Sequence, residues 1–178
     1  ILGYSYLLLS QKNFKDGFDL FDARLKSNSF RKKNIYHNNV NKKLTLSKNF
    51  ERQKKILIVK EQGVGDEILF SSMYVDLLKD CKDLKIECDP RLISIFKRSF
   101  GRNIFYPFGY FTSSEKRINS FENIFYAGSL TKYYRADLKN FNNISFLKIN
   151  KNYNKKILDK LKKFKNFKKV GISWKSVI

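Results

Sequence analysis

The chain has 178 residues, a formal net charge of +21 and an apolar fraction of 42%, and 16% of its residues are aromatic. This length has room for one domain, or for one domain plus fragments of others, and the apolar content is sufficient for a packed core, which argues against global disorder. The longest apolar runs, such as residues 4–9, are far shorter than the ~20 residues of a membrane span, so no transmembrane segment is expected.

The positive charge is spread along most of the sequence. Lysines and arginines are scattered among asparagine, isoleucine, phenylalanine and tyrosine, and only residues 155–169 form a dense basic run. That run carries apolar residues at helical spacing, namely Ile157, Leu158, Leu161 and Phe164. A solvated helix face is the usual meaning of such a pattern, so no specific nucleic-acid partner is expected.

The two cysteines give no sign of a metal site. Cys81 and Cys88 form no CxxC or Cys/His pattern. Buried, reduced thiols are typical of a cytoplasmic protein, and the sequence predicts that location.

Residues 1–27 predict a helical hairpin. Its two apolar faces comprise Tyr4, Leu7 and Leu8, and then Phe14, Phe18, Phe21 and Leu25. Such a pair cannot bury its faces alone, so we expect it to end a helical array or to cap the next domain. Residues 28–53 are polar and predict a linker.

Strands and helices then alternate. Strands are expected at residues 56–59, 84–88 and 104–106, within 121–128, and at 168–174. A helix is expected at residues 67–79, with an inward row of Leu69, Met73 and Leu77. A second is expected after an Asp89 cap, with Leu92, Ile93 and Phe96 facing inward. Two more are expected after Ser129 and at residues 152–165. This order predicts an α/β fold, in which a Rossmann-like parallel sheet has helices on both faces.

A glycine-rich turn follows the first strand. In open parallel sheets ligands bind at the carboxyl ends of the strands, where Gly63 and Gly65 fall. The dinucleotide pattern G-x-G-x-x-G fails here because its third position is Ile68, and the Gly-Lys-Ser/Thr of a P-loop is missing. Asp66 and Glu67 would repel a phosphate, so the turn is a poor phosphate cradle.

Two interpretations of Asp66 remain. It is a helix N-cap beside glycines that permit a tight turn, which needs no ligand. Alternatively, it is a carboxylate that accepts a proton or a hydrogen bond from a sugar hydroxyl. Spacing alone favours the N-cap.

Three blocks of sequence carry a family resemblance: "ILIVKEQGVGDEILFSSM", "KIECDPRLISIFKRSF" and "KVGISWKS". They resemble bacterial tetratricopeptide-repeat proteins with a glycosyltransferase-like domain, related to O-linked N-acetylglucosamine transferases and, more distantly, to heptosyltransferases. The segment "NFKDGFDLFDARLKSNSF" is similar to the last helical repeat of such proteins. The resemblance implies a GT-B architecture, with a first Rossmann-like lobe at residues 54–168 and the first strand of a truncated second lobe at 169–178.

The resemblance also implies site residues on the acceptor side. Asp66 matches the proposed catalytic base of the heptosyltransferases. Gln62, Gly63 and Gly65 would shape the acceptor-side turn.

On the donor side the resemblance implies that Ser173 and Lys175 lie near the donor phosphates, although Lys175 also fits a solvent-facing lysine. Ser129, in the block "AGSLTKYYR", would face the cleft, although a plain N-cap is an equal alternative.

The function that the resemblance implies is transfer of a sugar from a nucleotide-sugar donor to a hydroxyl of a protein or glycan acceptor, without a cofactor or metal. The chain is expected to be a fragment that is inactive without its donor lobe. The alternative is a non-catalytic interaction scaffold whose tetratricopeptide-like repeats bind a protein partner.

Overall fold

The computed structural model describes residues 1–27, 55–141 and 145–172. The chain divides into two compact units, residues 1–148 and 149–178. The expected linker, residues 28–53, lies outside the described residues. No helix among the described residues is long and apolar enough to cross a membrane.

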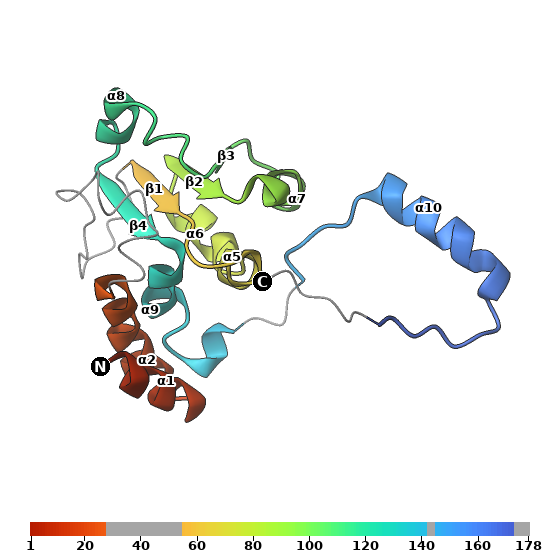
Figure 1. Cartoon of the computed structure of the whole chain (residues 1–178), viewed down its shortest axis with the longest axis horizontal. Coiled ribbons are helices and arrows are strands. Elements are labelled where there is room, and N and C mark those ends of the chain that lie inside the picture. The colour runs from red at the N-terminus through yellow and green to blue at the C-terminus, as the bar shows by residue number, and fades with distance from the viewer. Residues whose placement is uncertain (28–54, 142–144, 173–178) are drawn as a thin grey trace. The chain divides into compact units, whose positions relative to one another are not determined.

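A four-stranded parallel sheet forms the centre of the first unit (Figure 1). Its strands are β1 (Ile56–Val59), β2 (Leu84–Cys88), β3 (Phe105–Pro107) and β4 (Asn123–Tyr126), in the order β3-β2-β1-β4. In this register Ile56 lies opposite Leu84 on one side and Asn123 on the other. The predicted α/β fold class with a Rossmann-like parallel sheet is confirmed, and β3 begins one residue later than expected.

Both faces of the sheet are covered. Alternate side chains of a strand point to opposite faces, so the fully buried strand β1 contributes to two cores. Ile56 and Ile58 pack in the larger core, to which α5 (Val64–Ser71), α6 (Tyr74–Asp80) and α7 (Ile93–Phe100) also contribute. Leu57 and Val59 pack in a second core with residues of the segment that contains α8 (Glu115–Asn119).

The helix expected at residues 67–79 is two helices in the structure. α5 begins at Val64, and the helical hydrogen bonding is interrupted at Ser72 and Met73 before α6. Arg135 Nη2 donates a hydrogen bond of 3.0 Å to the carbonyl oxygen of Ser72 at this break. The break divides the predicted inward row: Met73 and Leu77 are buried, whereas Leu69 is 66% exposed.

The segment after β2 follows the prediction closely. The Asp89 side chain accepts a hydrogen bond of 3.0 Å from the backbone N–H of Arg91, and Pro90 begins the short 3₁₀ helix η2 (Pro90–Leu92), which leads into α7. Leu92 and Phe96 are buried as expected, whereas Ile93 is half-buried. α7 ends at Phe100 and is followed by Gly101, whose φ of +65° is the left-handed conformation favoured after a helix.

After β4 the chain forms the 3₁₀ helix η3 (Ala127–Leu130), then α9 (Thr131–Tyr134) and η4 (Leu138–Asn140). The short helix predicted after Ser129 is thereby confirmed.

Two helices at the N-terminal end form a hairpin that packs on the sheet domain. They are α1 (Leu2–Ser10) and α2 (Phe14–Phe21), followed by η1 (Asp22–Lys26), and α2 lies beside α9 (Figure 1). The helices are tightly joined, since Ser5 Oγ donates a hydrogen bond of 2.7 Å to the carbonyl oxygen of Gly17. Phe21 enters the larger core and Leu25 the second one.

The predicted faces of the hairpin are correct only in part. Leu8, Phe21 and Leu25 are buried, whereas Tyr4 and Leu7 are more than half exposed. The hairpin therefore caps the domain mainly through α2 and η1. Much of the apolar surface of α1 faces solvent.

The second unit contains α10 (Lys151–Leu161) and η5 (Lys162–Phe164). The Asn150 side chain caps α10 by accepting a hydrogen bond of 3.1 Å from the backbone N–H of Tyr153. Neither helix has a buried residue. The strand expected at residues 168–174 is not formed over 168–172, and its last two residues lie outside the described part of the chain.

Candidate functional site

The turn between β1 and α5 has a different backbone from the one predicted. Its left-handed residue is Gln62, with φ of +60°, whereas neither Gly63 nor Gly65 has a positive φ. A Cβ at Gly63 would meet its nearest heavy atom at 3.5 Å, and one at Gly65 would meet nothing within 4 Å. The two glycines are therefore not needed to form the turn. Gln62, Gly63 and Gly65 are all exposed.

Asp66 lies in the first turn of α5 instead of at its N-cap. Gly63 holds the N-cap position, and Asp66 Oδ2 accepts a hydrogen bond of 3.1 Å from the Gly63 backbone N–H. Within the described residues Oδ1 makes no hydrogen bond, and the side chain is half-buried. The carboxylate thus caps the helix with one oxygen, and its other oxygen can accept a further hydrogen bond.

A compact ionic cluster lies beside this turn, at the carboxyl ends of β1 and β2. Lys60 Nζ lies 2.9 Å from Glu67 Oε1 and 3.6 Å from Asp89 Oδ2. Glu67 Oε2 accepts a hydrogen bond of 2.8 Å from the Asp89 backbone N–H, which ties α5 to the end of β2. Arg91 donates two further hydrogen bonds to the Asp89 carboxylate.

The carboxylates of this cluster differ in their electrostatic environments. Burial raises the pKa of Glu67, and the hydrogen bond from Lys60 opposes this shift only in part. The side-chain hydrogen bonds from Arg91 lower the pKa of Asp89. Lys60 and Glu67 are not among the predicted site residues, because nothing in the sequence indicates which charges meet at the sheet edge.

Glu87, near the end of β2, has a structural role. Its two carboxylate oxygens accept hydrogen bonds from the backbone N–H groups of Gly109 and Phe111, at 3.0 and 2.9 Å. Since the side chain is fully buried, these bonds fix the turn after β3.

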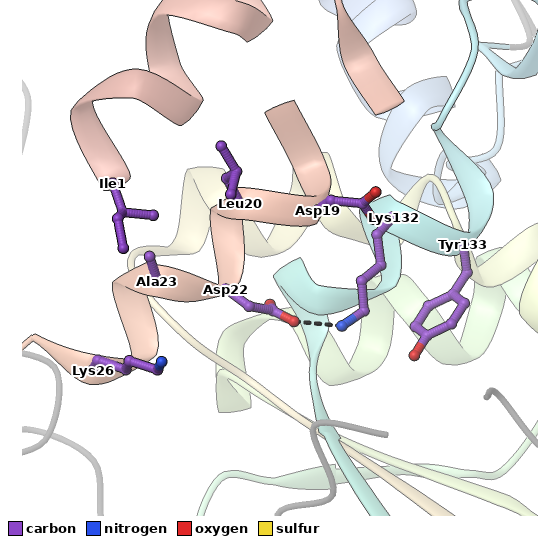
Figure 2. A pocket seen from close by; sticks show the side chains of 8 residues that line it. All are labelled: Ile1, Asp19, Leu20, Asp22, Ala23, Lys26, Lys132 and Tyr133. Carbon is purple, nitrogen blue, oxygen red and sulfur yellow. Dashed lines mark hydrogen bonds and ion pairs between the residues drawn. The ribbon is translucent and has the colours of Figure 1, made fainter. Parts of the chain in front are cut away.

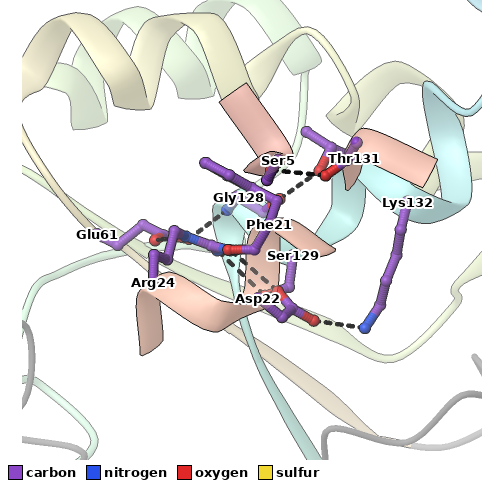
Figure 3. Close-up of polar contacts among 10 residues, drawn as sticks. Ser5, Phe21, Asp22, Arg24, Glu61, Gly128, Ser129, Thr131 and Lys132 are labelled. Carbon is purple, nitrogen blue, oxygen red and sulfur yellow. Dashed lines mark hydrogen bonds and ion pairs between the residues drawn. The ribbon is translucent and has the colours of Figure 1, made fainter. Parts of the chain in front are cut away.

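The topological switch point of the sheet lies between β1 and β4, where the strand order reverses. In open α/β sheets this crevice is the usual ligand site. Here it holds the guanidinium of Arg24, which η1 contributes (Figure 3). Arg24 Nε and Nη2 donate hydrogen bonds of 2.7 Å each to the two carboxylate oxygens of Glu61, the second residue after β1.

The loop after β4 closes around the same ion pair (Figure 3). Glu61 Oε1 also accepts a hydrogen bond from the Gly128 backbone N–H, and Arg24 Nη2 donates one of 3.2 Å to Ser129 Oγ. A Cβ at Gly128 would lie 2.6 Å from Glu61 Oε1 and 2.8 Å from Arg24 Nη2, so the close approach requires a glycine. The side chains of Arg24, Glu61 and Ser129 are buried, and the crevice is filled by the protein itself.

Of the two roles predicted for Ser129, the N-cap is wrong. It is buried within η3, and Leu130, not Ser129, is the N-cap of α9. Its hydroxyl donates a hydrogen bond to Asp22 Oδ1. Burial opposes ionisation of Asp22, but the hydrogen bonds from Lys132 and Ser129 outweigh it and lower the pKa of Asp22.

A pocket of about 800 Å³ lies between the hairpin and α9 (Figure 2). Its lining combines acidic, basic and apolar side chains: Ile1, Asp19, Leu20, Asp22, Ala23, Lys26, Lys132 and Tyr133. Burial, reinforced by the charges of Asp22 and Asp19, raises the pKa of Tyr133 to about 12. Among the residues that the structure describes, none of those predicted as functional lines this pocket.

The structure brings Gln62, Gly63, Gly65 and Asp66 together at the edge of the sheet. Ser173 and Lys175, predicted for the donor side, lie outside the described residues. Cys81 and Cys88 are buried thiols, and no group of three potential metal ligands occurs in the part of the chain that the structure describes. No protein-family model, curated protein or solved structure matches the chain.

Proposed function

We propose that residues 54–168 are the acceptor-side lobe of a GT-B glycosyltransferase. The observation that carries the proposal is the turn at the carboxyl edge of β1, where Asp66 keeps one oxygen available beside exposed Gln62, Gly63 and Gly65. Because Arg24 occupies the neighbouring crevice at the switch point, a ligand at this end of β1 would contact the exposed turn instead.

In the proposed reaction the acceptor hydroxyl oxygen attacks the anomeric carbon of a nucleotide-sugar. The bond from that carbon to the diphosphate breaks, the nucleoside diphosphate leaves, and the hydroxyl proton passes to Asp66. Glycines at positions 63 and 65 leave the turn without side chains, so an acceptor can approach the backbone closely. Ser173 and Lys175 would hold the donor phosphates from a second lobe, and Lys175 would offset the charge of the leaving diphosphate. The acceptor would be a protein or a glycan in the cytoplasm.

The second candidate is a non-catalytic scaffold that binds a protein partner through tetratricopeptide-like repeats. The exposed apolar side chains of α1, which include Tyr4, Tyr6 and Leu7, favour it. In that case the sheet domain would support the hairpin, and the turn at Asp66 would have no ligand.

The test is a calorimetric titration of the product of the complete reading frame with UDP, ADP and GDP, followed by assay of nucleotide release from the matching sugar donor. We expect one nucleotide to bind, and Asp66→Asn to bind it equally well while turnover falls by roughly 10²-fold or more. Asp16→Asn is the matched control, because Asp16 occupies the equivalent position in the first turn of α2.

Failure of every nucleotide to bind the folded protein would contradict the transferase proposal and leave the scaffold. Turnover that is unaffected by Asp66→Asn would remove Asp66 from the mechanism.

A further inference from the structure

The helical segment of the second unit, residues 149–172, presents an apolar stripe that the protein leaves exposed. Positions 153, 157, 161 and 164 are spaced by four, four and three residues, which places them on one side of a helix. Their side chains (Tyr153, Ile157, Leu161 and Phe164) are between 37% and 68% exposed. Phe167, Val170 and Ile172, which follow, are at least 69% exposed. Contiguous exposed apolar side chains of this kind mark an interaction surface.

The remaining surface of the segment is strongly basic. Residues 149–172 contain nine lysines and one acidic residue, Asp159. At 100° per residue, the lysines of α10 and η5 fall on the side of the helix away from the apolar stripe and along its borders. Asp159 is paired with Lys162 at 2.6 Å, so it does little to offset the positive face.

We propose that this segment, residues 149–172, docks on an anionic phospholipid surface. Such a surface offers negative headgroups to the lysines and an apolar layer beneath them to the stripe, so it matches both faces at once. A nucleic acid would use the lysines alone and leave the stripe in water. α10 has 11 residues and is about 16 Å long, which suits a helix lying in the plane of the interface. This proposal does not depend on the glycosyltransferase proposal.

The test is co-sedimentation of the 178-residue chain with vesicles of phosphatidylcholine alone or with phosphatidylglycerol added. We expect binding only to the anionic vesicles, and weaker binding as salt is raised. The double variant Ile157→Ser/Phe164→Ser keeps the charge and should weaken binding roughly tenfold or more, because it removes two large apolar side chains from the stripe. Leu138→Ser is the matched control, since Leu138 is 60% exposed but lies in η4. It should bind as the unmodified chain does.

A charge comparison separates this segment from the general positive charge of the protein. Lys156→Glu/Lys163→Glu should reduce binding roughly tenfold or more, whereas Lys82→Glu/Lys116→Glu, the same change at exposed lysines of the first unit, should reduce it much less. Because neither α10 nor η5 has a buried residue, the variants in this segment leave the core unchanged, and thermal unfolding of the sheet domain verifies this.

Absence of binding to anionic vesicles would overturn the proposal. So would binding that both lysine pairs weaken equally. Binding that is unaffected by the stripe variant but displaced by duplex DNA or RNA would also overturn it, and would identify a general polyanion surface instead.

Discussion

Arg24 and Glu61, 37 positions apart in the sequence, form a buried two-point ion pair that joins the N-terminal hairpin to the end of β1. Because the pair lies at the switch point, it fixes the hairpin to the sheet domain. The hairpin thereby also holds the start of the turn, because Glu61 directly precedes Gln62, the left-handed residue of that turn.

Breaking this pair from one side should be costly. Arg24→Met leaves the Glu61 carboxylate buried without its guanidinium, so we expect the free energy of unfolding to fall by about 3–5 kcal/mol. Urea denaturation followed by circular dichroism measures the change. Lys15→Met removes the exposed Lys15–Asp19 pair of 3.4 Å and should change the stability little.

A double-mutant cycle tests whether Arg24 and Glu61 act together. In Arg24→Met/Glu61→Gln the glutamine carbonyl still accepts the hydrogen bond from Gly128, and no unpaired charge remains. We therefore expect the double variant to lose clearly less stability than the sum of the two single variants. Additive losses would show that the pair is not coupled.

Two glycines should respond to alanine in opposite ways. Gly128→Ala places a methyl group 2.6 Å from Glu61 Oε1, so we expect a loss of about 1–3 kcal/mol in the free energy of unfolding, typical of overpacking. Gly65→Ala meets open space within α5 and should be neutral or slightly stabilising, because alanine favours helix. Equal losses in urea denaturation would contradict the geometry at Gly128.

Local signals in the sequence were sufficient for much of the fold. The apolar run at residues 56–59 predicts a strand buried on both faces, and Asp89 followed by Pro90 predicts the cap that the structure contains. In both cases the residues that determine the local structure lie within a few positions of each other in the sequence. The grouping of Gln62, Gly63, Gly65 and Asp66 at the sheet edge follows from the same local pattern.

The features that were missed depend on distant residues. The break at Ser72 involves Arg135, 63 positions away, and the site of Ser129 involves Asp22, 107 positions away. The glycine spacing at residues 63 and 65 also could not show that Gln62, and not a neighbouring glycine, takes the left-handed conformation. Long-range ion pairs such as Arg24–Glu61 leave no periodic signal, so the filled switch point was not predictable.

The thiol of Cys88 should be unreactive in the folded protein. Burial, followed by the negative charges of Glu67 and Asp89, raises its pKa to about 12 from an ordinary value of 9.0. The thiolate is the reactive form, and a shift of this size lowers its fraction about 10³-fold near pH 8. Iodoacetamide labelling at pH 8, mapped by mass spectrometry, should modify Cys88 much more slowly in buffer than in concentrated urea. Equal rates would contradict its burial.

Asp22 should contribute a pH-dependent part of the stability. Its folded pKa lies below the ordinary value of 3.8, so the contribution is fully present above pH 3.8 and is lost as the pH falls through the folded pKa. Asp22→Asn cannot ionise and lacks this contribution. We expect the wild type to exceed the variant in free energy of unfolding at pH 6, and the difference to shrink as the pH falls below 3.8.

Urea denaturation of both proteins between pH 6 and pH 2.5 measures this difference. The carboxylates that both proteins share make nearly equal pH-dependent contributions, which largely cancel in the difference. Asp159→Asn is the control, because it removes one carboxylate from α10 without touching the Asp22 network. A wild-type advantage that stayed constant over the whole range would show that the charge of Asp22 is not what Lys132 and Ser129 stabilise. Asparagine has nearly the same shape as aspartate, so the shape of the side chain cannot account for a large difference in the free energy of unfolding. A large difference that does not change with pH would therefore contradict the ionic network.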